Sequence, residues 1–156
     1  MIGKEGAKLE APCGSPAVAV TFDYEGEAVP EMFRLQVQNI CVKRGSPVVR
    51  ACHIIAACRQ DLCDTSSTAH AGIRVMGTSR PMLERNDFRG HRKAAVTFED
   101  SAGGNLRDNR IDAGEGYGII VGGSAAPLVE GNCLSGYIKP AIVVRDRAIA
   151  VVRSNK

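Results

Sequence analysis

The sequence contains no tryptophan, and its seven phenylalanines and tyrosines are scattered through 156 residues. Its net charge of +3 is small, and its lysines and arginines are interspersed with aspartates and glutamates. A protein that binds nucleic acid typically presents a basic groove with stacking aromatic side chains. This composition supports neither feature, so we expect no nucleic-acid partner.

Long apolar segments are also lacking. No run approaches the roughly 18 residues of a membrane-spanning helix, and the N-terminal Met-Ile-Gly-Lys-Glu-Gly has no signal-peptide core. These absences predict a chain that neither spans a membrane nor is secreted through such a signal. We expect it to act in the cytoplasm.

The six cysteines follow no regular spacing, and reduced thiols are the norm for a chain without a secretion signal. The best candidates for a metal site are Cys58 and Cys63, with His70 nearby in sequence. Their C-x4-C spacing is looser than the C-x2-C pair typical of zinc sites. We therefore expect free cysteines, no bound metal and no cofactor.

A repeat occupies the second half of the chain. Asparagines recur at intervals of 23 residues, at Asn86, Asn109, Asn132 and Asn155. Apolar columns keep the same spacing, at Ile73, Val96, Ile119 and Ile142, at Val75, Phe98, Val121 and Val144, and at Leu83, Leu106, Val129 and Val152. A constant period of this length indicates a solenoid.

Two solenoid types have units near this length. A leucine-rich repeat needs a denser leucine pattern than this sequence has. Instead, β-branched residues alternate with polar ones in short runs such as 72–76 and 141–145, which is typical of strands. The sequence predicts an all-β fold, a right-handed single-stranded parallel β-helix whose 23-residue coils stack about 4.8 Å apart.

The regular coils occupy residues 71–156 in this prediction. The β-helix begins at residue 17, with a looser first part in which Cys52 takes the asparagine position, and residues 55–70 form an irregular segment with an inserted loop. Residues 1–16 lack periodicity and are predicted to be a flexible tail. Because an open coil exposes strand edges, we expect the solenoid to continue in a longer protein or to be covered by another molecule at its C-terminal end.

The repeated asparagines are interpreted as corner residues that build the fold. Asparagine tolerates the left-handed backbone conformation of a tight corner, and stacked amides can hydrogen-bond from coil to coil. An outward column alternates in charge, with Glu84, Arg107, Glu130 and Arg153 as its members. This alternation predicts ion pairs between neighbouring strands.

A family resemblance rests on two segments, residues 72–88 and 118–134. They begin with Gly-Ile-Arg-Val-Met and Gly-Ile-Ile-Val-Gly, and in each a Pro, a Glu and an Asn follow. Over residues 71–155 the chain resembles the parallel β-helix proteins of the pectate-lyase-like superfamily. It is most similar to their non-secreted branch, which includes the β-helix region of an F-box ubiquitin-ligase protein and the SHC-binding spindle proteins. The resemblance implies a recognition surface for a protein segment or a carbohydrate. No F-box is recognisable in residues 1–35.

The enzymes of that superfamily act on polysaccharides and need paired carboxylates or a calcium site on one face. Asp100 and Asp146 are weak catalytic candidates, two coils and about 9.6 Å apart at strand spacing, with a glycine notch between them. That separation is at the outer limit of inverting glycosidases, and no third carboxylate joins them to hold calcium. The histidines, His53, His70 and His91, are expected to be solvated in or beside turns.

The predicted binding face combines mixed charge with apolar residues, and its members are Arg74, Thr97, Glu99, Asp100, Ile120, Arg145 and Asp146. Such a face suits a protein or glycan partner better than a uronate polymer, which would favour a row of lysines and arginines. We therefore predict a non-catalytic recognition or scaffold module. Two alternatives stay open: a polysaccharide lyase or glycoside hydrolase that uses Asp100 and Asp146, and an architectural subunit that stacks end to end.

Overall fold

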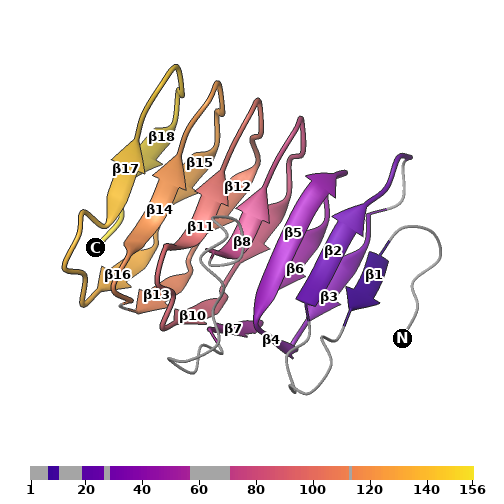
Figure 1. The fold of residues 1–156 in the computed structure, drawn as a ribbon, viewed down its shortest axis with the longest axis horizontal. Helices are drawn as coiled ribbons and strands as arrows, with labels where there is room; N and C mark the ends of the chain where they lie inside the picture. The colour runs from indigo at the N-terminus through magenta and orange to yellow at the C-terminus, as the bar shows by residue number, and fades with distance from the viewer. Residues whose placement is uncertain (1–6, 11–18, 27–28, 57–70, 113) are drawn as a thin grey trace.

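The computed structural model describes residues 7–10, 19–26, 29–56, 71–112 and 114–156, and within these ranges the chain forms strands and turns without a helix. The strands belong to three sheets, here sheets A, B and C, which wrap around one core (Figure 1). The described residues accordingly contain no helix that could cross a membrane. The predicted all-β architecture, a right-handed parallel β-helix, is confirmed.

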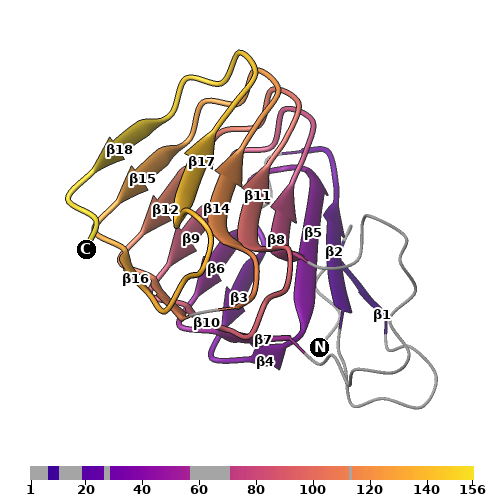
Figure 2. The same ribbon diagram turned by 60° about the vertical axis from the view of Figure 1, so that its left-hand side comes forward.

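From β2 to β16 each coil contributes one strand to each sheet, in the order A, B, C, and β17 and β18 continue sheets A and B; Figure 2 shows the sheets around the interior. In spatial order, sheet A contains β1 (Ala7–Glu10), β2 (Ala19–Asp23), β5 (Asn39–Arg44), β8 (Ala71–Val75), β11 (Ala94–Phe98), β14 (Tyr117–Val121) and β17 (Ile142–Val144). Sheet B contains β3 (Glu31–Phe33), β6 (Val48–Arg50), β9 (Met82–Glu84), β12 (Asn105–Arg107), β15 (Leu128–Glu130) and β18 (Val151–Arg153). Sheet C contains β4 (Gln36–Val37), β7 (His53–Ile55), β10 (Asp87–Arg89), β13 (Arg110–Asp112) and β16 (Cys133–Ser135).

The strands pair in the register that the 23-residue period predicts. Val96 of β11 pairs with Ile73 of β8 and Ile119 of β14, and Leu106 of β12 pairs with Leu83 and Val129. These inward residues are fully buried, so each apolar column of the sequence is one stack of core side chains. Burial of one such side chain stabilises the fold by about 1.5–3 kcal/mol relative to leaving it exposed.

The N-terminal end differs from the prediction of a flexible tail over residues 1–16. Ala7–Glu10 forms β1, which pairs antiparallel with β2 and so extends sheet A beyond its first parallel strand. The period could not predict β1, because an antiparallel strand does not follow the rise of the coils. The inserted loop expected within residues 55–70 lies outside the described residues, apart from Ile55 at the end of β7 and Ala56.

The asparagines form the predicted ladder between sheets B and C. Asn109 donates its backbone N–H and its Nδ2 to Oδ1 of Asn132, at 3.0 and 2.9 Å, and its own Oδ1 accepts the same two bonds from Asn86. Nδ2 of Asn109 also donates to the carbonyl oxygens of Leu83 and Arg107. Each internal amide is therefore satisfied by the coils on either side of it.

One detail of the predicted corner is wrong. The left-handed conformation falls on the residue before each asparagine, at Arg85, Asp108, Gly131 and Ser154, with φ between 53° and 68°. This placement leaves each asparagine with its amide turned into the ladder. The same geometry occurs one coil earlier, at the position predicted for Cys52: Ala51 is left-handed, and the following Cys52 donates its backbone N–H to Oδ1 of Asn86.

Candidate functional site

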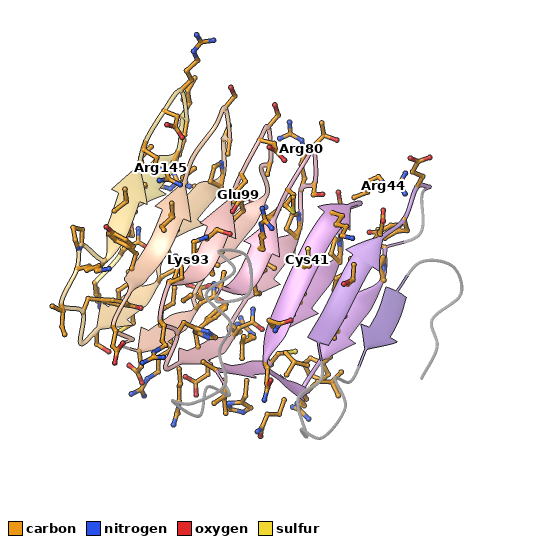
Figure 3. The ribbon with its side chains drawn as sticks, viewed as in Figure 1. Cys41, Arg44, Arg80, Lys93, Glu99 and Arg145 are labelled. Carbon is orange, nitrogen blue, oxygen red and sulfur yellow. The ribbon has the colours of Figure 1, made fainter. Side chains whose placement is uncertain are left out.

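The predicted binding face lies on the outer side of sheet A and on the turns that lead from sheet A to sheet B. Figure 3 shows this face, with Glu99 and Arg145 near the ends of β11 and β17. The outward column Arg74, Thr97, Ile120 and Val143 runs across neighbouring strands in the expected register. The structure thus brings the predicted residues onto one face.

Arg74 and Glu99 form the best-defined contact of this face. Nε and Nη2 of Arg74 both donate to one oxygen, Oε2 of Glu99, at 2.9 and 2.6 Å. This hydrogen bond raises the pKa of Arg74 above its ordinary value. The two side chains are about one-third exposed or less, so the pair is partly shielded from solvent. The sequence predicts that both residues lie on this face, but it does not predict their ion pair, because Arg74 and Glu99 belong to different columns of the repeat.

Asp100 and Asp146 are corner residues in the left-handed conformation, with φ of 58° and 62°. They alternate along one column with Gly77 and Gly123, which have φ of 63° and 64°. Oδ2 of Asp100 accepts the backbone N–H of Gly77 at 2.9 Å, and Oδ2 of Asp146 accepts that of Gly123 at 3.0 Å. Each carboxylate therefore caps the turn of the preceding coil, and short polar side chains are the ones that tolerate this conformation.

The glycine notch between the two aspartates is not empty. A Cβ added to Gly122 would lie 3.1 Å from Oδ2 of Asp146 and 3.3 Å from Nε of Arg145. One added to Gly123 would lie 2.7 Å from the backbone oxygen of Asp100. The space that the glycines leave thus admits the turn of the preceding coil and the side chains of the next.

Thr97 and Ile120 are much less accessible than the prediction assumed. Only 3% of Thr97 and 8% of Ile120 is exposed, although neither packs into the main core cluster. Arg74 and Ile120 stand on the two strands beside Thr97, and the guanidinium of Arg74 reaches across to Glu99. These two predicted contact residues are therefore closed to a partner, and the accessible part of the face consists of its charged residues and turns.

The outer face of sheet B carries the predicted column of alternating charge. Glu130 accepts from Nη2 of Arg107 at 2.5 Å and lies 2.8 Å from Nε of Arg153. These contacts hold the pKa of Glu130 below its ordinary value. The column begins earlier than the sequence indicated, because Arg50 lies 3.5 Å from Glu84. The charges of this face are thus paired with one another.

The histidines do not share one environment. His53 is exposed and lies 3.4 Å from Asp87, in agreement with a solvated position. His91 is buried, against prediction: its Nε2 lies 3.0 Å from the carbonyl oxygen of Ile54, and burial lowers its pKa. Tyr137 repeats this contact two coils later, with its hydroxyl donating to Ile111. This recurrence identifies a turn position whose ring points into the core.

Metal-binding side chains do not gather in the described ranges, which contain no group of three or more His, Cys, Asp or Glu residues able to hold an ion. The weak candidates Cys58, Cys63 and His70 lie outside those ranges. Of the cysteines in the described parts of the chain, Cys52 is buried, and burial raises the pKa of its thiol. Its Sγ lies 3.6 Å from the carbonyl oxygen of Met32, where an asparagine Nδ2 donates in later coils.

Comparison with known proteins agrees with this geometry. A family model described as the right handed beta helix region matches residues 36–156, which is most of the chain. Searches of curated proteins and of solved structures find no match. The matched range begins at β4 and includes every coil of the asparagine ladder. The chain therefore belongs to the right-handed β-helix family.

Proposed function

We propose that this protein is a non-catalytic recognition module that binds a protein partner through the outer face of sheet A and its adjoining turns. The observation that carries the proposal is that the acidic side chains of this face accept hydrogen bonds from the protein itself. Asp100 and Asp146 accept backbone N–H groups of neighbouring turns, and Glu99 accepts two bonds from Arg74. A general acid or base must be able to exchange a proton with substrate, and these carboxylates already serve the fold.

The accessible remainder of the face favours a polar partner. Arg145 is 63% exposed, and its nearest acidic group, on Asp146, is 3.9 Å away. Exposed hydroxyls follow at one-coil intervals along the turns, at Thr78, Ser101 and Ser124. Rigid strands hold these groups at fixed spacing, which lowers the conformational entropy lost on binding. A protein segment with acidic and hydrogen-bonding side chains fits this arrangement.

The carbohydrate-active alternative is tested with Asp100→Asn and Asp146→Asn, separately and combined. Asparagine can accept the same backbone N–H group and tolerates the same φ, so the fold should persist. The full chain is assayed for turnover against a panel of polysaccharides and on a glycan array. The proposal expects no turnover in any form; turnover by the unmodified chain that the double variant loses would establish the enzyme instead.

The binding proposal is tested with Arg145→Glu, and Arg110→Glu serves as the matched control. Arg110 is equally exposed, but it lies on sheet C and contacts Asp112. Proteins captured by the unmodified chain are identified and their affinities measured with purified partners. We expect Arg145→Glu to weaken binding at least tenfold and the control to leave it unchanged. Equal affinities for both variants would place the binding surface elsewhere.

A further inference from the structure

The outer face of sheet B carries an apolar column beside its charged one. The middle residue of each strand belongs to an inward column, so the first and third residues face outward. The third residues are Phe33 and the charged column from Arg50 to Arg153, across the row of strands from β3 to β18 (Figure 2). The first residues form the second outward column, and its apolar members are Val48, Met82, Leu128 and Val151, all of them at least partly exposed.

The composition of this face differs from that of its neighbour. Sheet C follows the same period, but its outward residues are mostly polar, among them His53, Asp87, Arg110 and Asp112. An exposed apolar column is therefore not a requirement of the coil. All basic residues in the described strands of sheet B are arginines, and these strands contain no lysine. Arginine and methionine are enriched at protein interfaces, whereas lysine is depleted. This face has the composition of a surface that contacts another protein.

The charged column is ordered within the chain itself. Arg50 lies 3.5 Å from Glu84, and Glu130 contacts both Arg107 and Arg153. Arginine and glutamate thus alternate from coil to coil, at a spacing of about 4.8 Å. A surface with the same alternation can set an opposite charge against each of these side chains, and little conformational entropy is lost because they are already held. The same face of a second copy has this alternation.

We propose that two copies of this chain associate through the outer faces of sheet B, about a two-fold axis that runs along the strands, between β9 and β12. The rotation reverses the order of the coils, so that β9 meets β12, β6 meets β15 and β3 meets β18. Glu84 of one copy then faces Arg107 of the other, and Arg50 faces Glu130, each pair occurring twice. An axis centred on a coil would instead place like charges together. An axis between β12 and β15 would leave β3 and β6 without a facing strand.

The same rotation also matches the apolar columns. Val48 of one copy faces Leu128 of the other, and Met82 faces Asn105. Rotation about the long axis of the solenoid would instead lay the charged column of each copy over the apolar column of the other, which buries charges against apolar side chains. The contact is isologous and closes after two copies. At ordinary strand spacing the face measures roughly 24 Å by 10 Å, so we expect a weak dimer with a dissociation constant on the order of 0.1 mM. This inference does not depend on the function proposed for sheet A.

The full 156-residue chain is first examined by sedimentation velocity from about 5 µM to about 1 mM, at about 0.15 M salt. We expect a monomer at the lowest concentration and a dimer at the highest. A chain that stays monomeric throughout would show that no second copy covers this face. Assemblies that keep growing beyond the dimer would contradict the two-fold axis. Either result would overturn the proposal.

A charge exchange tests the register of the contact. Glu84→Arg and Arg107→Glu each set like charges against each other across the axis, so each variant alone should dimerise at least about tenfold more weakly. An equimolar mixture of the two should restore the dimer, because the introduced arginine of one variant faces the introduced glutamate of the other. The ion pairs within each chain are disturbed equally before and after mixing, so recovery reports contact between copies.

Arg110→Glu on the outer face of sheet C is the matched control and should leave dimerisation unchanged. Far-ultraviolet circular dichroism checks that the variants fold. If Glu84→Arg or Arg107→Glu does not fold, Leu128→Lys on the outer side of β15 takes their place and should also weaken the dimer at least about tenfold. Dimers that survive these substitutions, or that fail to return when folded Glu84→Arg and Arg107→Glu are mixed, would overturn the proposal.

Discussion

Replacing Asn109 by alanine should cost far more stability than a surface substitution, because it breaks the ladder at its centre. The backbone N–H of Asn86 and one hydrogen of its Nδ2 lose their acceptor, and the carbonyl oxygen of Leu83 loses its donor. All of these groups are buried, so water cannot replace the lost partners without opening the coil. Each unsatisfied buried group costs about 1–3 kcal/mol, and the expected loss is about 3–5 kcal/mol.

The position of the asparagine in the ladder should set the size of the loss. Asn155 is only partly buried, and it lies at the end of the stack. Its replacement by alanine would also remove the acceptor of the Asn132 N–H, but solvent can reach the vacated site. We therefore expect a loss of about 1–2 kcal/mol for Asn155→Ala. The difference in lost stability between Asn109→Ala and Asn155→Ala separates the contribution of the buried ladder from the effect of replacing any asparagine by alanine.

Asn109→Asp provides a second comparison, because aspartate has the same shape. One carboxylate oxygen could still accept both bonds from Asn86, whereas the other would face Oδ1 of Asn132 and the carbonyl oxygens of Leu83 and Arg107. It would then be an acceptor, or a buried charge, in a site built from acceptors. Burying an unpaired charge is more costly than losing a neutral hydrogen bond. We expect Asn109→Asp to be less stable than Asn109→Ala.

The assay combines urea unfolding, followed by circular dichroism, with native-state amide hydrogen exchange at Ile111 and Val129. Exchange is needed because a solenoid can open in parts, and a single unfolding midpoint then loses its meaning. The matched control is Asn105→Ala in the same coil, where the side chain lies on the partly exposed outer face of β12. It should change stability by less than about 0.5 kcal/mol. Equal losses for Asn109→Ala and Asn155→Ala, or a more stable Asn109→Asp, would refute the reasoning.

Three further changes test other parts of the fold. Because burial lowers the pKa of His91, the unfolded chain takes up a proton as the pH falls below about 6.5 while the folded chain resists it, so the free energy of unfolding should decrease with falling pH in that range. His91→Tyr, which introduces the residue type found at the equivalent position 137, should flatten this pH dependence in urea titrations between pH 7.5 and 5. An unchanged pH dependence would contradict the role given to His91. Cys52→Asn should extend the ladder by one amide and raise the free energy of unfolding by about 1 kcal/mol, because Oδ1 of the introduced asparagine would reach the backbone N–H of Leu35. A destabilised variant would show that this coil has no room for the larger side chain. Gly123→Ala should lower stability by at least about 1–2 kcal/mol in thermal unfolding, because alanine disfavours φ of 64° and its Cβ would contact Asp100. The neighbouring exposed Ser124→Ala should leave stability unchanged, and two unchanged variants would refute this explanation.

Most of the fold could be predicted from the sequence because every coil repeats the same pattern of inward apolar residues. An inward apolar residue at one position fixes the register of its neighbours 23 residues away, and the buried columns of Ile73 and Leu83 follow directly. The left-handed corner was misplaced by one residue because it is filled by Arg85, Asp108, Gly131 and Ser154, which share no residue type. Backbone geometry repeats there without a sequence signal.

The candidate site could be predicted only in part. Strand alternation assigns Thr97 and Ile120 to the outer face, but periodicity does not report how far an outward side chain is covered, and only 3% and 8% of these two residues is exposed. Aspartate is common at bends, but the hydrogen bonds of Asp100 and Asp146 to glycine N–H groups depend on the three-dimensional stacking of coils and leave no signal in the sequence. The buried ring of His91 could have been found by comparison with Tyr137, which lies 46 residues later at the same position of the repeat.

The direction of the asparagine ladder gives the solenoid an electrical polarity. Every side-chain amide from Asn86 to Asn132 accepts through Oδ1 from the N-terminal side and donates to the next amide on the C-terminal side, while its Nδ2 also donates to a strand carbonyl of the preceding coil. Aligned amide dipoles add and polarise one another, so the bonds at the middle of the row should be stronger than those at its ends. The positive pole of these dipoles points toward residues 137–156, which contain five basic residues and one acidic residue. The row itself therefore has two unequal ends, with amide oxygens directed toward Cys52 and amide hydrogens directed toward Asn155.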